Sequence, residues 1–239
     1  MSKFILQKSS ERGKANYGWL DTNYSFSFAN YYNPNQMGFG ALRVLNDDIV
    51  IGGMGFGTHA HDNMEIVTIP LEGELKHRDS MNSSTVIKFG EIQVMSAGSG
   101  ITHSEINNKK DELLKLLQIW VVPNKINVTP RYDELSYSEE NLKNNFYQIV
   151  SPNQKDAGSW IHQNAWFYLG KFDKDSVITY NLKDKSNGIY LFVIDGEAEL
   201  ENQILNKRDA IGVWECEEIK IKNLSDKSFL LLIEVPMEF

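Results

Sequence analysis

The sequence predicts an all-β protein built from two tandem barrels. Short apolar stretches alternate with glycine-containing turns along most of the chain, a pattern typical of antiparallel sandwiches and barrels. An internal repeat supports this, because residues 67–74 and 190–197 each form a strand-like stretch that enters an acidic-Gly-Glu turn. Residues 90–94 and 208–213 repeat the similarity at a similar offset. Two matches at one offset indicate two copies of one barrel.

The first fifty residues are rich in aromatic side chains. Residues 24–28 alternate aromatic residues with serines, which predicts a strand with one packed face, and residues 33–35 predict a turn. Most of the rings are expected in the core, and a minority are expected to line a pocket for a flat aromatic ligand. The aromatic residues concerned are Tyr17, Trp19, Tyr24, Phe26, Phe28, Tyr31 and Tyr32.

The remaining strands are predicted at short intervals along the chain. They cover residues 42–45, 48–51, 64–71, 74–78, 85–88, 92–95 and 112–122, and then 165–172, 176–181, 189–194, 198–202, 210–214, 218–221 and 229–235. The leucines of 112–122 would also suit a helix, but its end, Ile-Trp-Val-Val before Pro123, favours a strand. Four glycines between residues 52 and 57 suit a sharp bend into the next strand.

A polar connector is the best candidate for a domain boundary. Apolar alternation fades from Pro123 to about Phe146, and Ser138 is a suitable N-cap for one short helix. We therefore expect an N-terminal metal-binding domain over residues 1–135 and a metal-free C-terminal domain over residues 136–239.

Composition narrows the classes of function. The net charge of −8 argues against broad attraction to nucleic acid or anionic lipid, and there is no apolar run of the length that a bilayer requires. The start of the chain lacks the features of a signal peptide. Cys216 is the only cysteine, so a reducing cytoplasm is the expected location, and its acidic neighbours predict an inert, half-buried thiol.

Residues 53–106 hold four of the five histidines and are the expected site of chemistry. Ligand-type residues are spaced one apart in His59-Ala60-His61 and again in His103-Ser104-Glu105. Alternate side chains of a strand share a face, so two such strands facing one another would bring three imidazoles and a carboxylate together. That set suits a divalent transition metal and leaves positions free for water or substrate.

The first pair also fits the motif of the cupin barrel, Gly-x5-His-x-His-x3-Glu. Gly53, His59, His61 and Glu65 fill it here. Glu65 is then an alternative fourth ligand, because an even strand would place it on the face of the two histidines.

Residues 59–80 and 93–105 together resemble the double signature of the pirin family of bicupins. Residues 11–34 resemble in particular its bacterial members described as quercetin 2,3-dioxygenases. The match is strong over about residues 10 to 135 and weak over the rest. Two small departures are Ala60, where many members have proline, and residues 62–64, where many have Arg-Gly-Phe.

The resemblance implies two tandem cupin barrels and a metal held by His59, His61, His103 and Glu105. It favours Glu105 over Glu65 as the carboxylate ligand, with Glu65 as a partner beside the ligands. His77 is expected to be either a structural residue or a partner beside the ligands. A place in the pocket lining is the remaining alternative. The second copy carries no histidine at the equivalent positions, and His162, upstream of them, is expected to be a structural or surface residue.

The function that this resemblance implies is flavonol ring opening with dioxygen at one divalent metal ion. Iron is expected, and copper, nickel, manganese, zinc and cobalt are the alternatives. Glu105 would accept the proton of the flavonol 3-hydroxyl. The alternatives are a non-enzymatic regulatory or redox-sensing metal protein and a cupin enzyme with another substrate. The chain is expected to be a monomer. A protein partner is compatible with the regulatory alternative, and neither nucleic acid nor a membrane is an expected partner.

Overall fold

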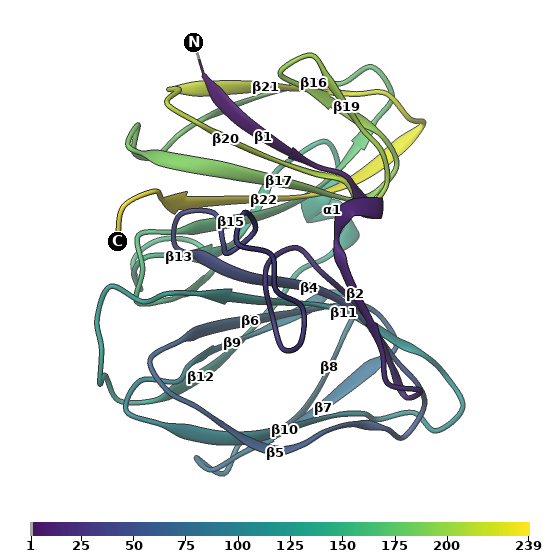
Figure 1. Cartoon of the computed structure of the whole chain (residues 1–239), viewed down its shortest axis with the longest axis vertical. Helices are drawn as coiled ribbons and strands as arrows, with labels where there is room; N and C mark the ends of the chain where they lie inside the picture. Colours follow the sequence, from purple (N-terminus) through teal and green to yellow (C-terminus); the bar gives the residue numbers. More distant parts are fainter. Residues whose placement is uncertain (1) are drawn as a thin grey trace.

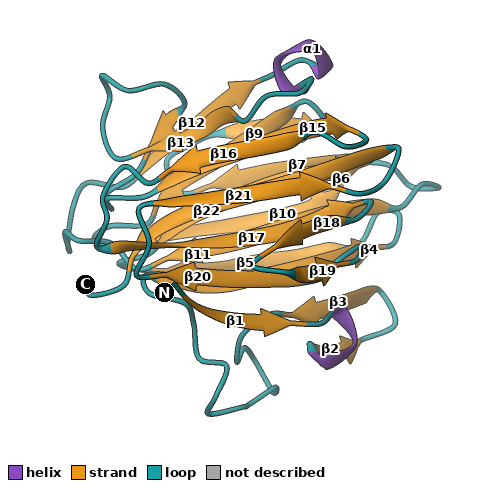
Figure 2. Cartoon of the chain, turned by 90° about the horizontal axis from the view of Figure 1, so that it is seen from above, coloured by secondary structure: helices purple, strands orange, loops and turns teal. Residues whose placement is uncertain are grey.

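The computed structural model describes residues 2–239, and within them 22 strands form four sheets stacked as layers (Figure 1). The strands of the four layers run in similar directions, with loops gathered at their two ends (Figure 2). This architecture confirms the predicted all-β fold of two tandem barrels. Each barrel consists of one large sheet and one small sheet, and the two large sheets form the middle layers.

The N-terminal barrel provides the two lower layers of Figure 1. Its large sheet has the order β12 (Arg131–Ser136), β9 (Glu91–Ser96), β6 (Glu65–Glu72), β11 (Leu114–Val121), β4 (Leu42–Val50), β3 (Leu20–Tyr24) and β2 (Gly13–Asn16). Its small sheet has the order β5 (Gly55–His61), β10 (Ile101–Asn107), β7 (Glu74–Asp79) and β8 (Ser84–Lys88).

The C-terminal barrel repeats this order. Its large sheet consists of β1 (Lys3–Gln7), β20 (Ala210–Trp214), β17 (Asn187–Asp195), β22 (Lys227–Pro236), β15 (Trp166–Asp173), β13 (Tyr147–Ser151) and β14 (Ser159–Trp160). Its small sheet consists of β16 (Val177–Asn181), β21 (Glu218–Asn223), β18 (Ala198–Leu200) and β19 (Gln203–Leu205). The repeat seen in the sequence is therefore β6 followed by β7 and β17 followed by β18, joined at Gly73 and Gly196, whose φ values are 80° and 85°.

Helical structure is limited to a 3₁₀ turn (Ser9–Glu11) and α1 (Glu139–Leu142) within the described residues. Ser138 caps α1 as predicted, since its Oγ accepts a hydrogen bond from the backbone N–H of Asn141 at 3.3 Å. No helix of residues 2–239 has the length and apolar character needed to cross a membrane.

Three predictions of local structure need correction. Residues 131–136, expected to belong to the polar connector, form β12 and pair with β9. Residues 42–45 and 48–51 are parts of one strand, β4. The strand predicted over 24–28 is wrong, because β3 ends at Tyr24 and the chain then bends into paired backbone hydrogen bonds between Phe28 and Tyr31. The alternation misled because Ser25 and Ser27 are as buried as the rings between which they lie. The leucine-rich segment 112–122 forms β11, as predicted.

The apolar core explains why only one barrel has room for a site. The largest cluster lies between the two large sheets, and a second fills the C-terminal barrel. The interior of the N-terminal barrel is instead divided between two small clusters. On β11, Leu116 belongs to one of them, Trp120 packs against the other, and Gln118 lies between. The middle of this barrel is therefore polar.

The first strand of the chain belongs to the second barrel. β1 pairs with β20, from Lys3 opposite Trp214 to Gln7 opposite Ala210, and it lies among the late strands in Figure 1. β12 occupies the matching edge of the other large sheet, beside β9. The domain boundary between residues 135 and 136 remains a prediction. If the boundary lies there, we propose that the N-terminal domain contributes β1 to the large sheet of the C-terminal domain.

Replacing Gln7 by alanine should lower the free energy of unfolding by about 1–3 kcal/mol, because it leaves a buried hydroxyl without its acceptor. Gln7 is 6% exposed and accepts a 2.7 Å hydrogen bond from Tyr190 Oη of β17. Lys3→Ala on the same strand is the control, since it removes only an exposed ion pair with Glu215 and should change stability by less than about 1 kcal/mol. Equal urea midpoints for the two variants would contradict this role of Gln7.

Candidate metal centre

Three of the predicted ligands converge where β5 and β10 pair. The antiparallel register places His103 opposite His59, and Ile101 opposite His61. The Nε2 atoms of His59 and His103 are 3.0 Å apart, and the ring centroids of all three histidines lie within 4.8 Å of one another. The potential ligand atoms of His59, His61 and His103 also lie within 4.8 Å of one another.

Glu105 lies two residues beyond His103 on β10, past a bulge in the pairing with β5. It is 3% exposed and its carboxylate accepts three hydrogen bonds. Gln93 Nε2 and Thr68 Oγ1 donate to Oε1 at 2.8 and 3.3 Å, and Gln118 Nε2 donates to Oε2 at 2.8 Å. The large sheet thus holds the carboxylate from the opposite side of the barrel, through β9, β6 and β11.

His77 joins Glu105 and His103 in a second, overlapping group of potential ligand atoms within 4.8 Å of one another. It is fully buried on β7, directly opposite Glu105, and stacks on Tyr132 with ring centroids 4.6 Å apart. Its Nε2 lies 3.0 Å from Asp79 Oδ2, while Nδ1 has no hydrogen-bond partner among the described residues. His77 is therefore close to the ligands, as one of the sequence alternatives expected.

Burial keeps two of the imidazoles neutral. Desolvation, and after it the neighbouring imidazole charges, lowers the pKa of His103 to about 3 and that of His61 to about 4. Desolvation raises the pKa of Glu105 to about 7, against the hydrogen bonds from Gln93, Thr68 and Gln118. Neutral imidazoles have free lone pairs, so at neutral pH His61 and His103 are ready to bind a cation.

Glu65 does not share this site. β5 ends at His61, the chain turns at Asn63 with φ of 41°, and Glu65 begins β6 in the other sheet. There it lies three residues before Thr68 and so points to the opposite face of the sheet, where Ser96 Oγ donates to it at 2.7 Å. The expectation that it sits on the face of His59 and His61, as a competitor or as a partner of the ligands, is wrong.

The donor set fits a transition metal ion. Two nitrogens that each lie about 2.1 Å from one ion at right angles are about 3.0 Å apart, which matches the Nε2 separation of His59 and His103. Three imidazoles with a buried carboxylate nearby are typical donors for iron, copper, nickel, manganese or zinc. His103 Nδ1 and His77 Nδ1 are buried without a hydrogen-bond partner among residues 2–239, as in a site that expects a further group.

The C-terminal barrel carries no comparable group. Its strands β16 and β21 present Tyr180, Ile219 and Ile221 to an apolar core. His162 is half-buried outside them, with its ring against Trp160. Cys216 is half-buried, and desolvation followed by the charges of Glu201 and Glu234 raises the pKa of its thiol.

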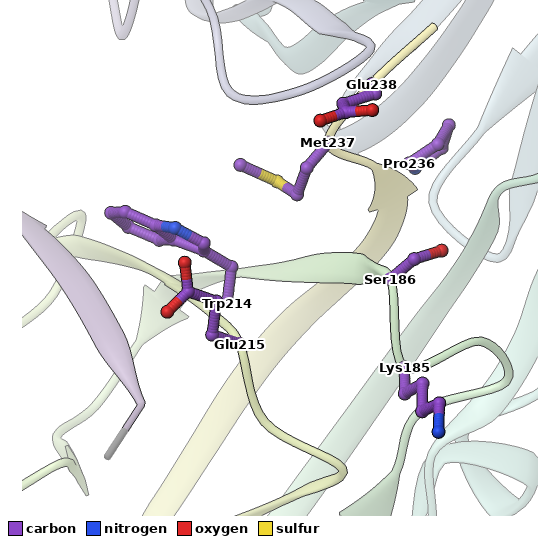
Figure 3. Close-up of a pocket in the computed structure, with 7 residues that line it drawn as sticks. All are labelled: Lys185, Ser186, Trp214, Glu215, Pro236, Met237 and Glu238. Carbon is purple, nitrogen blue, oxygen red and sulfur yellow. The ribbon is translucent and has the colours of Figure 1, made fainter.

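A hollow of about 600 Å³ opens in the C-terminal half, beside Trp214 and Met237 (Figure 3). The described residues that line it include no histidine. The hollow is large, but its lining residues do not form a group of metal ligands like the histidine cluster.

Comparison with known proteins agrees with this geometry. Residues 6–121 match the family described as Pirin, and residues 148–235 match the Quercetinase C-terminal cupin domain. A quercetin 2,3-dioxygenase of Escherichia coli K12 is 40% identical over 231 residues, which are 97% of this chain and 98% of that protein. The chain belongs to the pirin family.

The structural neighbours agree with the pirin fold. The bacterial pirin YhhW of Escherichia coli in complex with nickel(II) superposes with a TM-score of 0.92 at 39% identity, over 98% of this chain and 99% of that one. A putative quercetin 2,3-dioxygenase of Zymomonas mobilis is 38% identical over 223 residues, or 92% of this chain and 94% of that protein. The bicupin fold implied by the resemblance is thus confirmed.

Sequence reasoning missed the three side chains that hold Glu105. Thr68, Gln93 and Gln118 lie in register across β6, β9 and β11. The repeat contains a signal for them, because the corresponding strands β17, β20 and β22 carry Leu191, Ile211 and Leu232, also in register with one another. The N-terminal barrel thus has Thr68, Gln93 and Gln118 where the C-terminal barrel has three apolar residues, and this difference distinguishes the barrel that carries the site.

Proposed function

We propose that the chain is a metal-dependent dioxygenase of the quercetin 2,3-dioxygenase type, which opens the central ring of flavonols. The residues that would hold the ion are His59, His61, His103 and Glu105. The observation that carries this proposal is the imidazole cluster next to a buried carboxylate held by two glutamines. The names of relatives at 40% and 38% identity support the class of reaction.

When bound, a divalent transition ion supplies Lewis acidity and a path for electrons between substrate and dioxygen. The chain's own part begins with Glu105, whose carboxylate accepts the proton of the flavonol 3-hydroxyl. In the metal-free site burial raises the pKa of Glu105 to about 7, and a bound cation would favour the carboxylate form that accepts a proton. Gln93 and Gln118 keep this carboxylate in one orientation, so the proton is taken at a fixed place.

Apolar rings cover part of the centre, where His59 and His61 are half-buried. The Trp120 ring packs edge-on against His61 with centroids 4.9 Å apart, and the Phe56 ring lies 6.3 Å from that of His59. A low-dielectric wall strengthens the polar interactions within the site and protects a reactive substrate anion from protonation by solvent.

Metal binding should release about one more proton at pH 6 than at pH 8 through Glu105, because a group with a pKa near 7 is protonated at the lower pH and a cation favours its carboxylate. Calorimetric titration with a divalent ion in buffers of different ionisation enthalpy measures this number. Glu105→Gln removes the contribution of this group alone and leaves that of the histidines. Equal proton release by the wild type and the variant at pH 6 would argue against Glu105 as a ligand.

Oxygen uptake and carbon monoxide release, measured on iron-loaded protein with a panel of flavonols, test the function. The proposal predicts that both gases change in equal amounts with at least one flavonol. Oxygen uptake without carbon monoxide would assign the chain to another oxidation, and no uptake would favour the regulatory reading. We further propose iron as the resident ion, a cytoplasmic location and a monomer. Metal analysis of protein purified without chelators and sedimentation analysis test the ion and the monomer.

A further inference from the structure

An aromatic pocket opens beside the metal centre within the N-terminal barrel. It encloses about 260 Å³ between β3, β4, β5 and the loop that follows β3. Five of its ten lining residues are aromatic: Tyr17, Trp19, Tyr24, Phe28 and Phe56. Tyr17 is 47% exposed at the surface, while Tyr24 is buried, so the pocket runs from solvent into the barrel.

The walls of the aromatic pocket end at the imidazoles. The Phe56 ring is 6.3 Å from the ring of His59, and on the other side the Phe28 ring lies 5.3 Å from that of Trp120, which in turn contacts His61. A flat molecule that fills the pocket therefore has one end next to the histidine cluster.

Two buried hydrogen-bond acceptors line the pocket. Asn46 and Asp48 are alternate residues of β4 and are 4% and 3% exposed. Asn46 Oδ1 and Asp48 Oδ1 have no hydrogen-bond partner among residues 2–239, and neither has the hydroxyl of Thr22, which lies opposite Asp48 in the same pocket. Because buried polar atoms are nearly always paired, two neighbouring acceptors on an aromatic-walled pocket indicate a ligand that donates hydrogen bonds.

The face of the large sheet that carries Asn46 and Asp48 also carries Gln118, which holds the carboxylate of the metal centre on the small sheet. Asn46 lies opposite Gln118, whose Nε2 donates to Glu105, and the charges of Asp48 and Glu105 repel one another. Desolvation, opposed by the adjacent Thr22 hydroxyl, raises the pKa of Asp48 to about 7. At neutral pH this group is partly a neutral carboxyl, and a neutral carboxyl and an amide can both accept a hydrogen bond from a hydroxyl.

We propose that the aromatic pocket binds a hydroxylated aromatic ring of the ligand, with Asp48 and Asn46 accepting hydrogen bonds from its phenolic hydroxyls. The identity of the whole ligand rests on the proposed function, and the new element is that Asp48 and Asn46 select rings by their hydroxyls. A site built to pair with a hydroxyl rejects the analogue that lacks it, because its buried acceptors then stay unpaired.

The test compares quercetin with two analogues, one lacking the hydroxyls of the pendant ring and one lacking those of the fused ring. Dissociation constants are measured by calorimetry on metal-loaded protein without oxygen, so that binding is seen without turnover. The wild type should bind at least one analogue about 10- to 100-fold more weakly than quercetin. Asp48→Ala should bring that ratio close to one, and Asn46→Ala should reduce it.

Asp21→Ala is the matched control, because Asp21 is an exposed residue of β3 that points to the opposite face from Thr22. It should keep the wild-type ratio. Asp48→Leu separates ligand recognition from folding, since replacing an unpaired buried carboxylate by an apolar side chain of similar size should leave the melting temperature unchanged or higher while the ratio falls. A lower melting temperature with an unchanged ratio would overturn the proposal, as would a wild type that binds the three molecules equally. Ring selection without oxygen uptake would contradict the proposed function and leave this inference standing.

Discussion

Glu105→Gln is expected to lower flavonol-dependent oxygen uptake by about 100- to 10,000-fold, the range for loss of a general base. The variant keeps the size of the side chain but cannot accept the substrate proton. Gln93 and Gln118 both donate to Glu105, so in the variant one of them must rotate its amide by about 180° and present its oxygen to the new NH₂ group. This rotation exchanges the amide oxygen and nitrogen and needs no movement of the rest of the side chain. Bound metal should therefore fall much less than activity.

Glu65→Gln provides a matched comparison. Glu65 is as buried as Glu105, and desolvation likewise raises its pKa to about 7, but it lies on the far face of the sheet. This variant should keep near wild-type oxygen uptake and carbon monoxide release. Full activity in Glu105→Gln, or a comparable loss in both variants, would remove Glu105 from the role of base.

His103→Ala is expected to weaken metal binding by at least about 100-fold, the upper end of what loss of an outer partner costs a metal site. The reason is that His103 belongs to both groups of potential ligands, with His59 and His61 on one side and with His77 and Glu105 on the other. Elemental analysis after dialysis against a known free-metal concentration measures the effect, and activity should disappear with the metal.

His162→Ala is the control for that experiment. His162 is the one histidine outside residues 53–106, and it packs against Trp160 away from the cluster. Its loss should leave the metal content near that of the wild type. A His103→Ala protein that binds metal as tightly as the His162→Ala protein would refute the assigned centre.

Local pattern was sufficient to predict most of the fold. Alternation and turn residues located the central strands of both barrels, and the repeat gave the number of barrels. The strands β1, β2, β3, β12, β13, β14 and β19 were not predicted. Alternation failed at residues 24–28, because both faces of that segment are buried and its backbone bends. The pairing of β1 with β20 could not be predicted, since it joins segments about 200 residues apart and no local pattern records that.

The histidines of the site were visible in the sequence, but their surroundings were not. One His-x-His spacing, at His59 and His61, and one His-x-Glu spacing, at His103 and Glu105, are enough to suggest a cluster when both lie on strands. The misplacement of Glu65 came from assuming an even strand across Asn63, where the chain turns into another sheet. Gln93 and Gln118 have no motif of their own, so only a register or the comparison with Ile211 and Leu232 of the second barrel identifies them.

The position of β1 has a consequence for how the chain is made. Its partner strand, Ala210–Trp214, leaves the ribosome after almost all of the protein has been synthesised. During synthesis β1 therefore stays unpaired while the strands of the metal-binding barrel, which follow it in the chain, can already fold. Arg12 and Arg208 both approach Asp47, at 3.6 and 3.0 Å, so one aspartate of the first barrel contacts the segment after β1 and the turn before β20. Pairing of β1 with its partner is possible only after residues 210–214 have been synthesised.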